Sequence, residues 1–474
     1  MVCALLLAST LRQRWHYRGC QSDSFANLTK YNGDTVRIVK TRSCISVNNI
    51  TDASASKNIS PYCANSHFLY FAGIPLENAA IRLESGNLQL FIDDPHPSSA
   101  LWHGETPSRE EIAAKIGADE AKTMAELENY LENAATLPVQ DATTWTQQTQ
   151  LLNRWVLPKN PRSGIDLELA KAIVSLRLTH DPAALVELRK AAAVSVTAHK
   201  AGMAATPSAK LEAEVRAAME AVIMGQNMTT AYNSIVTVYG EVLHNNHYHH
   251  SLQPGDLLLA DVGAETQTGW AADITRTWPV SGKFSSTQRD IYDIVLAAHD
   301  ACIQNIAPGV EYAEIHLLAA TIIAEGLVDL GILQGKPEDL VKMDLHALFF
   351  PHGIGHLLGL DVHDMEDLGD IAGYDQGRSR SSRFGLSYLR LNRPLRAGML
   401  VTIEPGFYQV PAILNDPKTR SQYQYLVNWE RLAQFADVRG IRIEDDVLVT
   451  ESGSEVLTAA LPNQASAVED LVGC

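Results

Sequence analysis

Four short stretches decide how this chain folds and what it binds: DVGAETQTGWAADITRTWP (261–279), HGIGHLLGLDVHD (352–364), TIEPG (402–406) and GIRIEDD (440–446). From these stretches we select four carboxylates and one histidine, each in a strand-like or glycine-marked context, as candidate metal ligands. These residues are Asp261, Asp273, His356, Glu404 and Glu444. Oxygen-rich ligands suit hard divalent cations, and four carboxylates carry about the charge needed to balance two such ions. The pattern predicts a site for two metal ions and a metal-assisted hydrolysis.

The first pair of carboxylates is predicted to lie on a hairpin. Asp261 ends an apolar strand, glycines at 263 and 269 mark a turn region, and Asp273 follows twelve residues later in a second extended segment. A hairpin of this length places both side chains on one face. Either aspartate alone is equally typical of an ordinary turn. The complete set of carboxylates favours the metal ligands.

The second stretch is rich in histidine and glycine. Its histidines are His352, His356 and His363. A neutral imidazole is a good ligand for a first-row divalent ion, and glycine permits close approach of the backbone. One histidine completes the metal site and the others act around it. A further cluster, HNNHYHH (244–250), is typical of a solvated loop as much as of a site.

The last two carboxylates lie in strand-like sequences. Glu404 closes the apolar run MLVTIEPG, and strand alternation puts Arg442 and Glu444 on the same face of GIRIEDDVLVT. Buried charges must be paired or bound to metal. For this stretch alone, a network of salt bridges is the alternative to a metal site.

Composition limits the function classes. At 474 residues the chain is long enough for two domains, and its net charge of −17 without a basic block argues against nucleic acid or an anionic membrane surface as partner. No apolar run is long enough to predict a membrane span. MVCALLLAST lacks a preceding positive region, which argues against a signal peptide, and the sparse, unpaired cysteines indicate the cytoplasm.

The sequence divides into three regions. Residues 1–64 are polar and cysteine-containing and show no sustained pattern. Residues 65–166 predict a small α/β domain with strands at 68–73 and 88–93 and a helical stretch over 107–135, capped by Ser108. Residues 167–474 begin with predicted helices at 168–203 and 208–224 and contain all the candidate ligands.

Together the four motifs resemble those of the Xaa-Pro aminopeptidases (aminopeptidase P) and prolidases, over about residues 65–465. The resemblance implies an α+β protein, with a C-terminal pita-bread (creatinase/aminopeptidase-like) domain after a smaller α/β domain. It implies two divalent metal ions, usually manganese, on the five ligands named above. The implied activity releases the N-terminal residue from peptides with proline in second position.

The resemblance also assigns residues around the metals. His352 and His363 match histidines that contact substrate or the developing oxyanion, His244 matches a histidine ahead of the first Asp strand, and Arg442 matches an arginine that steadies the ligands. Glu404 is the expected proton acceptor. A homodimer or homotetramer is implied, in which Trp102 resembles an aromatic that reaches a neighbouring active site. A half-buried core tryptophan is the alternative for Trp102.

Some alternatives remain open. A prolidase that cleaves only Xaa-Pro dipeptides has nearly the same motifs, and a non-catalytic binding protein can keep the same fold. Methionine aminopeptidases generally lack the domain over 67–170. The two aspartates are usually eleven residues apart in the family and are twelve apart here, and an added residue around 266–268 would leave the ligands in place. At the N-terminus, PYCANSHFLYFAG replaces an expected Arg-Gln-Asp-Ser type segment. We therefore interpret residues 1–64 as a divergent or frame-shifted translation, with a lineage-specific extension as the alternative.

Overall fold

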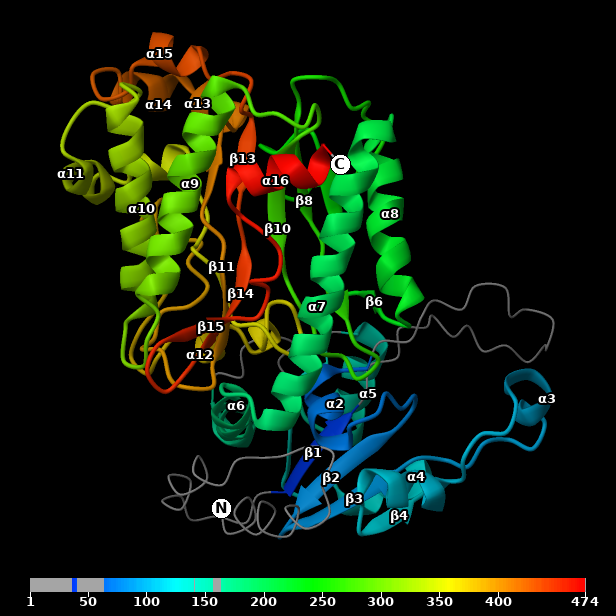
Figure 1. The fold of residues 1–474 in the computed structure, drawn as a ribbon. Coiled ribbons are helices and arrows are strands. Elements are labelled where there is room, and N and C mark those ends of the chain that lie inside the picture. The colour runs from blue at the N-terminus through cyan, green and yellow to red at the C-terminus, as the bar shows by residue number, and fades with distance from the viewer. Residues whose placement is uncertain (1–35, 41–63, 140, 157–162, 474) are drawn as a thin grey trace. The chain divides into compact units, whose positions relative to one another are not determined.

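A computed structural model gives the fold and describes residues 36–40, 64–139, 141–156 and 163–473 (Figure 1). The chain forms two compact units. The first contains residues up to Ala184 together with Met365–Ala372, and the second contains Leu185–Asp364 and Gly373–Cys474. The chain therefore leaves the second unit once, directly after the histidine-rich stretch, and returns to it eight residues later.

The first unit is built on a mixed five-stranded sheet in the order β4-β3-β2-β1-β5. Antiparallel pairs join β1 to β2 and β2 to β3, whereas β4 and β5 are added in parallel. Phe68 and Ile112, from two helices, pack against Ile81 and Leu90 of the sheet. The elements are β1 (Val36–Lys40), α2 (Ser66–Ala72), β2 (Ala80–Glu84), β3 (Asn87–Phe91), α3 (Ser99–His103), α4 (Arg109–Ile116), β4 (Glu120–Lys122), η2 (Met124–Tyr130), β5 (Ala134–Thr136), α5 (Ala142–Leu151) and α6 (Gly164–Arg177).

Strand β1 lies inside the region 1–64. Its backbone pairs with β2 from Arg37 to Lys40, so these residues take part in the sheet. Residues 1–35 and 41–63 lie outside the described part, and their origin stays a prediction.

The domain boundary at 166/167 also stays a prediction. In the structure, α6 is tied to the first unit because Asp166 accepts a hydrogen bond from Thr136 and pairs with Arg154.

Two predictions of local structure in this unit are wrong. Residues 68–73 form helix α2 and not a strand, because the side chain of Asn65 caps the first turn and Gly73, at a φ of 80°, ends it. Within the helix predicted over 107–135, only the eight residues of α4 are α-helical, and β4, the 3-10 helix η2 and the start of β5 follow. Ser108 caps it as expected, in a capping box with Glu111, but Gly117 at a φ of 72° stops it. The strand predicted at 88–93 is confirmed as β3.

The helix predicted over 168–203 is interrupted. It is α6 followed by α7 (Pro182–Ala205), because Pro182 cannot continue a helix and instead starts one. Asp181 caps that start by accepting hydrogen bonds from Ala183 and Ala184. The helix predicted at 208–224 is confirmed as α8 (Glu212–Gly225).

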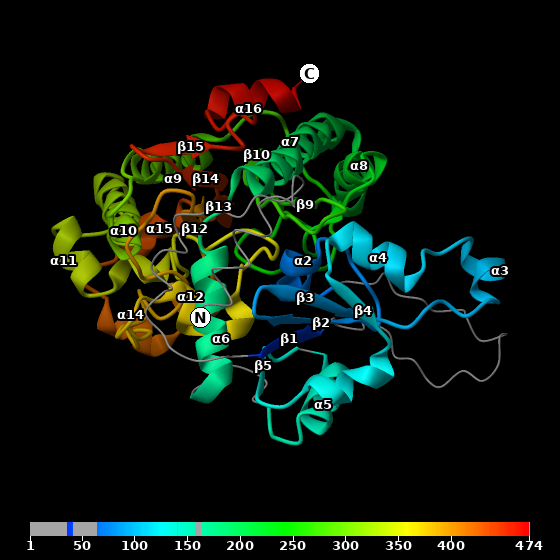
Figure 2. The same cartoon turned by 90° about the horizontal axis from the view of Figure 1, so that it is seen from below.

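In the second unit, pairs of helices flank short strands. Figure 1 shows α7 and α8 on one side of β8 and β10, and α9 and α10 on the other, and Figure 2 shows the same arrangement from below. The strands are β6 (Thr229–Thr230), β7 (Ile235–Thr237), β8 (Leu257–Asp261), β9 (Ala264–Glu265), β10 (Thr275–Pro279), β11 (Leu400–Ile403), β12 (Gly406–Tyr408), β13 (Gly440–Arg442), β14 (Asp445–Val449) and β15 (Ser454–Val456). The helices are η3 (Thr206–Ser208), α9 (Ser286–Gln304), α10 (Tyr312–Asp329), α11 (Pro337–Lys342), η4 (Leu345–Leu348), α13 (Pro411–Leu414), α14 (Pro417–Gln422), α15 (Trp429–Ala433) and α16 (Ala465–Val472). Helices η5 (Glu366–Leu368) and α12 (Asp370–Gly373) lie between them in sequence, and their residues up to Ala372 belong to the first unit.

The strands form small antiparallel sheets, β10-β8-β7 and β11-β14-β15, with the pairs β12-β13 and β6-β9. Two isolated bridges link segments that carry candidate ligands. Thr275 pairs with Glu444, and Leu357 pairs with Val401. The ends of β8, β10, β11 and β13 therefore meet in one region. Within the described ranges, no helix combines the length and apolar character needed to cross a membrane.

Candidate active site

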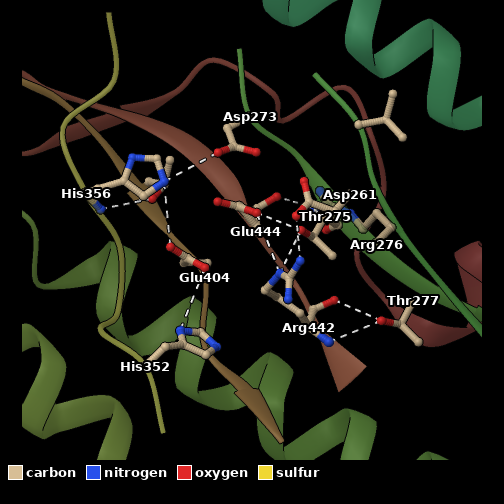
Figure 3. A network of polar contacts seen from close by, with 12 residues as sticks. Asp261, Asp273, Thr275, Arg276, Thr277, His352, His356, Glu404, Arg442 and Glu444 are labelled. Atoms are coloured by element: carbon tan, nitrogen blue, oxygen red, sulfur yellow. Dashed lines mark hydrogen bonds and ion pairs between the residues drawn. The ribbon is translucent and has the colours of Figure 1, made fainter. Parts of the chain in front are cut away.

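Four separate segments supply the candidate ligands (Figure 3). Asp261 ends β8 and lies opposite Thr275 of β10, so the predicted hairpin forms and brings Asp273 back beside it. Gly263 makes this possible, because a Cβ there would lie 1.8 Å from the carbonyl oxygen of Ala272. Glu404 follows β11 and Glu444 follows β13. We call Asp261, Asp273, His356, Glu404 and Glu444 the carboxylate site.

A histidine joins two of the carboxylates. Nε2 of His356 lies 3.4 Å from Oδ2 of Asp273 and 3.7 Å from Oε1 of Glu404. Its Nδ1 donates to the carbonyl of Leu357 at 3.0 Å, so Nε2 is the ring atom that faces the carboxylates. Burial opposes the charged imidazole, but Asp273 and Glu404 outweigh burial and raise the pKa of His356. One ligand atom each from Asp273, His356 and Glu444 lies within 4.8 Å of the other two. This spacing suits a single cation between them.

Tyr232 connects the remaining aspartate to the group. Its hydroxyl is 2.5 Å from Oδ1 of Asp261 and 2.5 Å from Oδ1 of Asp273. Burial, followed by the charges of these two aspartates, raises the pKa of the phenol well above its usual value. The phenol therefore stays protonated and bridges the two carboxylates. All five predicted ligands are thereby brought together in one place.

The excess negative charge of the carboxylate site favours bound cations. Burial raises the pKa of Asp261 to about 6 although Arg442 opposes it, and burial raises that of Glu404 to about 7 although His356 and Arg442 oppose it. Burial and the neighbouring Asp273 carboxylate raise the pKa of Glu444 well above its usual value. Four buried carboxylates with one imidazole and one guanidinium hold excess negative charge. The donor set therefore fits divalent metal ions.

Arg442 and Thr275 organise the ligands from one side. Nη2 of Arg442 donates to Oδ2 of Asp261 at 2.5 Å, and its Nε donates to Oγ1 of Thr275 at 2.9 Å. Thr275 in turn donates to Oε2 of Glu444 at 2.6 Å. One guanidinium thus orients Asp261 directly and Glu444 through a hydroxyl, as in other sites where partners behind the ligands fix their orientation.

The other predicted histidines are held in their neutral form. Nε2 of His352 accepts from the hydroxyl of Tyr408 at 2.8 Å, and its Nδ1 lies 3.8 Å from Oε2 of Glu404. Burial and the charge of Arg442 lower the pKa of His352 to about 3. The ring of His363 stands nearly perpendicular to that of His356 at 4.4 Å, and burial and that neighbour lower its pKa to about 2. Partial burial and the guanidinium of Arg442 also lower the pKa of His244.

Other predicted features lie outside the carboxylate site. His250 of HNNHYHH contacts the buried carboxylate of Glu212 at 2.8 Å, and the neighbouring His247 and His249 are exposed. That cluster is a loop in the described structure. Trp102 on α3 is 65% exposed, so the alternative of a half-buried core residue is wrong.

Sequence reasoning missed three polar residues of the site: Tyr232, Thr275 and Tyr408. Thr275 could have been found from the sequence, because it follows Asp273 by two residues and strand alternation therefore places both side chains on the same face. Tyr408 stands four residues after Glu404, across β12. Tyr232 lies 29 residues before Asp261 and carries no local pattern that points to a metal.

Comparison with known proteins identifies the family of the chain. The model of metallopeptidase family M24 matches residues 186–451, and the model of the aminopeptidase P N-terminal domain matches residues 39–140. All five members of the carboxylate site fall within the first match.

Relatives cover most of the chain. A probable Xaa-Pro aminopeptidase of Fusarium vanettenii is 34% identical over 421 residues, which are 86% of this chain and 86% of that protein. One of Podospora anserina is 34% identical, covering 83% of this chain and 85% of the relative. Among solved structures, Pseudomonas aeruginosa aminopeptidase PepP is 26% identical with a TM-score of 0.75 and 98% of both chains covered. Zn-substituted Escherichia coli aminopeptidase P in complex with product is 27% identical with a TM-score of 0.74, covering 95% and 96%. The chain therefore belongs to metallopeptidase family M24, in the group of Xaa-Pro aminopeptidases that carry the aminopeptidase P N-terminal domain.

Proposed function

We propose that this chain is a dinuclear metal-dependent Xaa-Pro aminopeptidase whose ions are held by Asp261, Asp273, His356, Glu404 and Glu444. Manganese is the proposed native metal. The observation that carries the proposal is the convergence of these five side chains from four segments, with the pKa values of Asp261, Glu404 and Glu444 raised by burial. Bound divalent ions supply a lowered pKa for water and stabilisation of negative charge on the scissile carbonyl.

Glu404 is the proposed proton carrier. It accepts the proton of the attacking water and passes it to the leaving proline nitrogen, which restores the carboxylate. Its position supports this role, because Oε1 faces His356 at 3.7 Å while Oε2 faces His352 at 3.8 Å. One carboxylate thus faces both a proposed metal ligand and a histidine that binds no metal in this proposal.

The neutral histidines stabilise the substrate. His363 donates to the developing oxyanion, and His352 and His244 line the side that receives proline. The hydroxyl of Tyr408 accepts from Nη1 of Arg442 at 3.1 Å and donates to His352 at 2.8 Å. This contact fixes the tautomer of His352 with its proton on Nδ1, which donates to the carbonyl of Gly353 at 2.7 Å.

The proposed substrate is a peptide with proline in second position. A proline bond lacks an N–H, and the ring restricts the residue before it, so peptidases that grip an extended backbone lose contacts there. Support for this preference comes from the relatives, which carry the name Xaa-Pro aminopeptidase.

Peptide hydrolysis with defined metal content tests the proposal. Chelator-treated protein is reloaded with Mn²⁺ and assayed on Gly-Pro, on Ala-Pro-Ala and on a pentapeptide with proline in second position, with Ala-Ala-Ala as control. We expect two ions per chain, release of the first residue from both longer proline peptides, and no cleavage of the control. Cleavage of Gly-Pro alone would identify a prolidase. If the protein is loaded with two ions and cleaves none of the peptides, it is a non-catalytic binding protein. Glu404→Gln with full metal content and full activity would remove Glu404 from its role.

Assembly and location are part of the proposal. We propose a homodimer or homotetramer on the basis of the family, with the exposed Trp102 on α3 at the interface. Light scattering of the wild type and of Trp102→Ala tests this, and a monomeric wild type would contradict it. A cytoplasmic location is supported by cysteine usage, since Cys302 is free and buried.

A further inference from the structure

A buried ion pair lies behind Glu444. The guanidinium of Arg276, on β10, is fully buried, and Nη2 donates to both carboxylate oxygens of Asp445 at 2.8 and 3.0 Å. Nη1 donates to the backbone carbonyl of Glu444 at 2.7 Å, and Figure 3 shows Arg276 beside Thr275. The remaining donors reach the carbonyls of Thr275, Leu461 and Pro462. The guanidinium of Arg276 thus connects β10, the backbone of Glu444 and the loop before α16.

Two more side chains contact the same carboxylate, His299 at ion-pair distance and Thr458 through a hydrogen bond. Nε2 of His299, on α9, lies 3.1 Å from Oδ2 of Asp445, and the hydroxyl of Thr458 donates to Oδ1. Thr458 also accepts a hydrogen bond from the backbone N–H of Asp446 at 3.2 Å. Asp445 is therefore fixed by partners from β10, α9 and the segment after β15. We call Arg276, Asp445, His299 and Thr458 the rear network.

The rear network fixes the backbone of Glu444, one of the proposed metal ligands. The N–H of Glu444 donates to the carbonyl of Thr275 at 3.0 Å, and its carbonyl accepts from Arg276. Both backbone polar groups of Glu444 are thereby bonded, so the position of its Cα is set from behind. Its carboxylate meets the hydroxyl of Thr275 only while that backbone stays in place.

Stability alone does not account for such a network. A buried Arg–Asp pair gains little net free energy compared with well-packed apolar residues, because desolvation offsets the attraction. Its directional hydrogen bonds instead impose one geometry. Partners behind metal ligands typically change metal affinity or activity by about 10–100-fold when removed.

We propose that Arg276, Asp445 and His299 are positioning residues that fix the main chain of Glu444 and so set the geometry in which the carboxylate site binds its metal ions. The proposal rests on the proposed function, since it assigns a purpose to residues behind those ligands. It concerns residues that touch neither substrate nor metal.

His299→Phe tests the proposal, because it removes the contact to Asp445 while leaving Arg276 paired. Tyr292→Phe is the matched control. Tyr292 is buried on the same helix and donates its hydroxyl hydrogen bond to the carbonyl of Asn463 at 2.7 Å and not to Asp445. Chelator-treated proteins are titrated with Mn²⁺ by calorimetry, and kcat, KM and thermal unfolding are measured.

We expect His299→Phe to bind Mn²⁺ about tenfold more weakly and to lose about tenfold in kcat, with KM within about twofold. Tyr292→Phe keeps wild-type affinity and kcat, and His299→Gln, whose amide can donate to Asp445, recovers most of both. Wild-type Mn²⁺ affinity in His299→Phe, or equal losses in both variants, overturns the proposal. If His299→Phe does not fold, Thr458→Val and Thr458→Ser give the same comparison, since serine keeps the hydroxyl. A wild type that binds no Mn²⁺ contradicts the proposed function instead.

Discussion

Thr275 and Glu444 are 169 residues apart in sequence, yet the threonine hydroxyl donates a 2.6 Å hydrogen bond to Oε2 of the glutamate. The same hydroxyl accepts from Nε of Arg442 at 2.9 Å. The hydroxyl thus gives Glu444 a neutral donor and gives Arg442 an acceptor. Its removal leaves two buried charged groups each without one partner.

We predict that Thr275→Val weakens Mn²⁺ binding about 10–100-fold, because the carboxylate of Glu444 loses its orienting donor. Thr275→Ser keeps the hydroxyl and serves as the control, with affinity within a few-fold of wild type. Calorimetric titration of the metal-free proteins measures the difference. Equal affinities of the valine and serine variants would show that this hydrogen bond does not orient the ligand.

Tyr232→Phe is expected to weaken the link between Asp261 and Asp273. Two buried carboxylate oxygens lose the one hydroxyl proton that they share, at 2.5 Å from each, so we expect lower Mn²⁺ affinity and a loss of about 1–3 kcal/mol in the free energy of unfolding. Urea unfolding and metal titration measure the two effects. Tyr248→Phe, which removes a hydroxyl bonded to Ser234, is the control for metal affinity. The prediction is contradicted if both variants bind the ion equally well.

Metal removal is expected to make stability fall as pH rises. In the ion-free fold the pKa values of Asp261 and Glu404 are about 6 and 7, above their ordinary values of 3.8 and 4.5. The folded state therefore binds more protons than the unfolded chain between about pH 4 and 7, and its stability is lost as pH rises through that window. Saturating Mn²⁺ removes this loss and adds about 4 kcal/mol at a thousand times its Kd. Thermal unfolding at pH 5 and pH 8, with chelator or Mn²⁺, gives the test; a chelated protein equally stable at both values contradicts it.

A pair of buried histidines predicts acid sensitivity with the opposite sign. His316 and His346 lie 6.0 Å apart by ring centroids, and burial lowers the pKa of each to about 4. Because the unfolded chain takes up protons near pH 6.5 and the folded state only near pH 4, stability is fully present above pH 6.5 and falls as pH drops to 4. Each histidine lowers the free energy of unfolding by about 3 kcal/mol over this pH range. His316 is oriented by the carbonyl of Gly385, so His346→Phe is the cleaner variant. Urea unfolding from pH 7.5 to 4.5 should show a shallower loss in this variant, and an unchanged slope would contradict the assignment.

Gly355→Ala is predicted to disrupt the metal site through the backbone. A Cβ at this position would lie 2.1 Å from the carbonyl oxygen of Thr402 and 2.3 Å from the hydroxyl of Tyr312. The backbone must shift, and His356 is the next residue, so we expect loss of metal content and a lower melting temperature. Gly225→Ala, with nothing within 4 Å of the added carbon, is the control. Normal metal content in Gly355→Ala would show that the loop adapts.

The residues of the carboxylate site were predicted because each lies next to a strand-like or glycine-marked stretch, and local patterns of this kind are visible without a fold. It did not predict Tyr232, because that phenol reaches the aspartates through the tertiary structure alone. The wrong predictions of secondary structure have causes in neighbouring residues. Asn65 and Gly73 made a helix of an apolar run that was predicted as a strand, and Asp181 with Pro182 divided one predicted helix into two. In each case a capping side chain outweighed the hydrophobic pattern.

The bridge between Thr275 and Glu444 also bears on how the protein acquires its ions in a cell. At typical rates of synthesis, the ribosome adds the intervening residues over roughly 10–30 s, during which the aspartate hairpin has emerged but the last glutamate has not. A nascent chain can offer only part of the coordination sphere. Which cation finally occupies it is therefore decided after translation, by the free concentrations that the completed polypeptide meets.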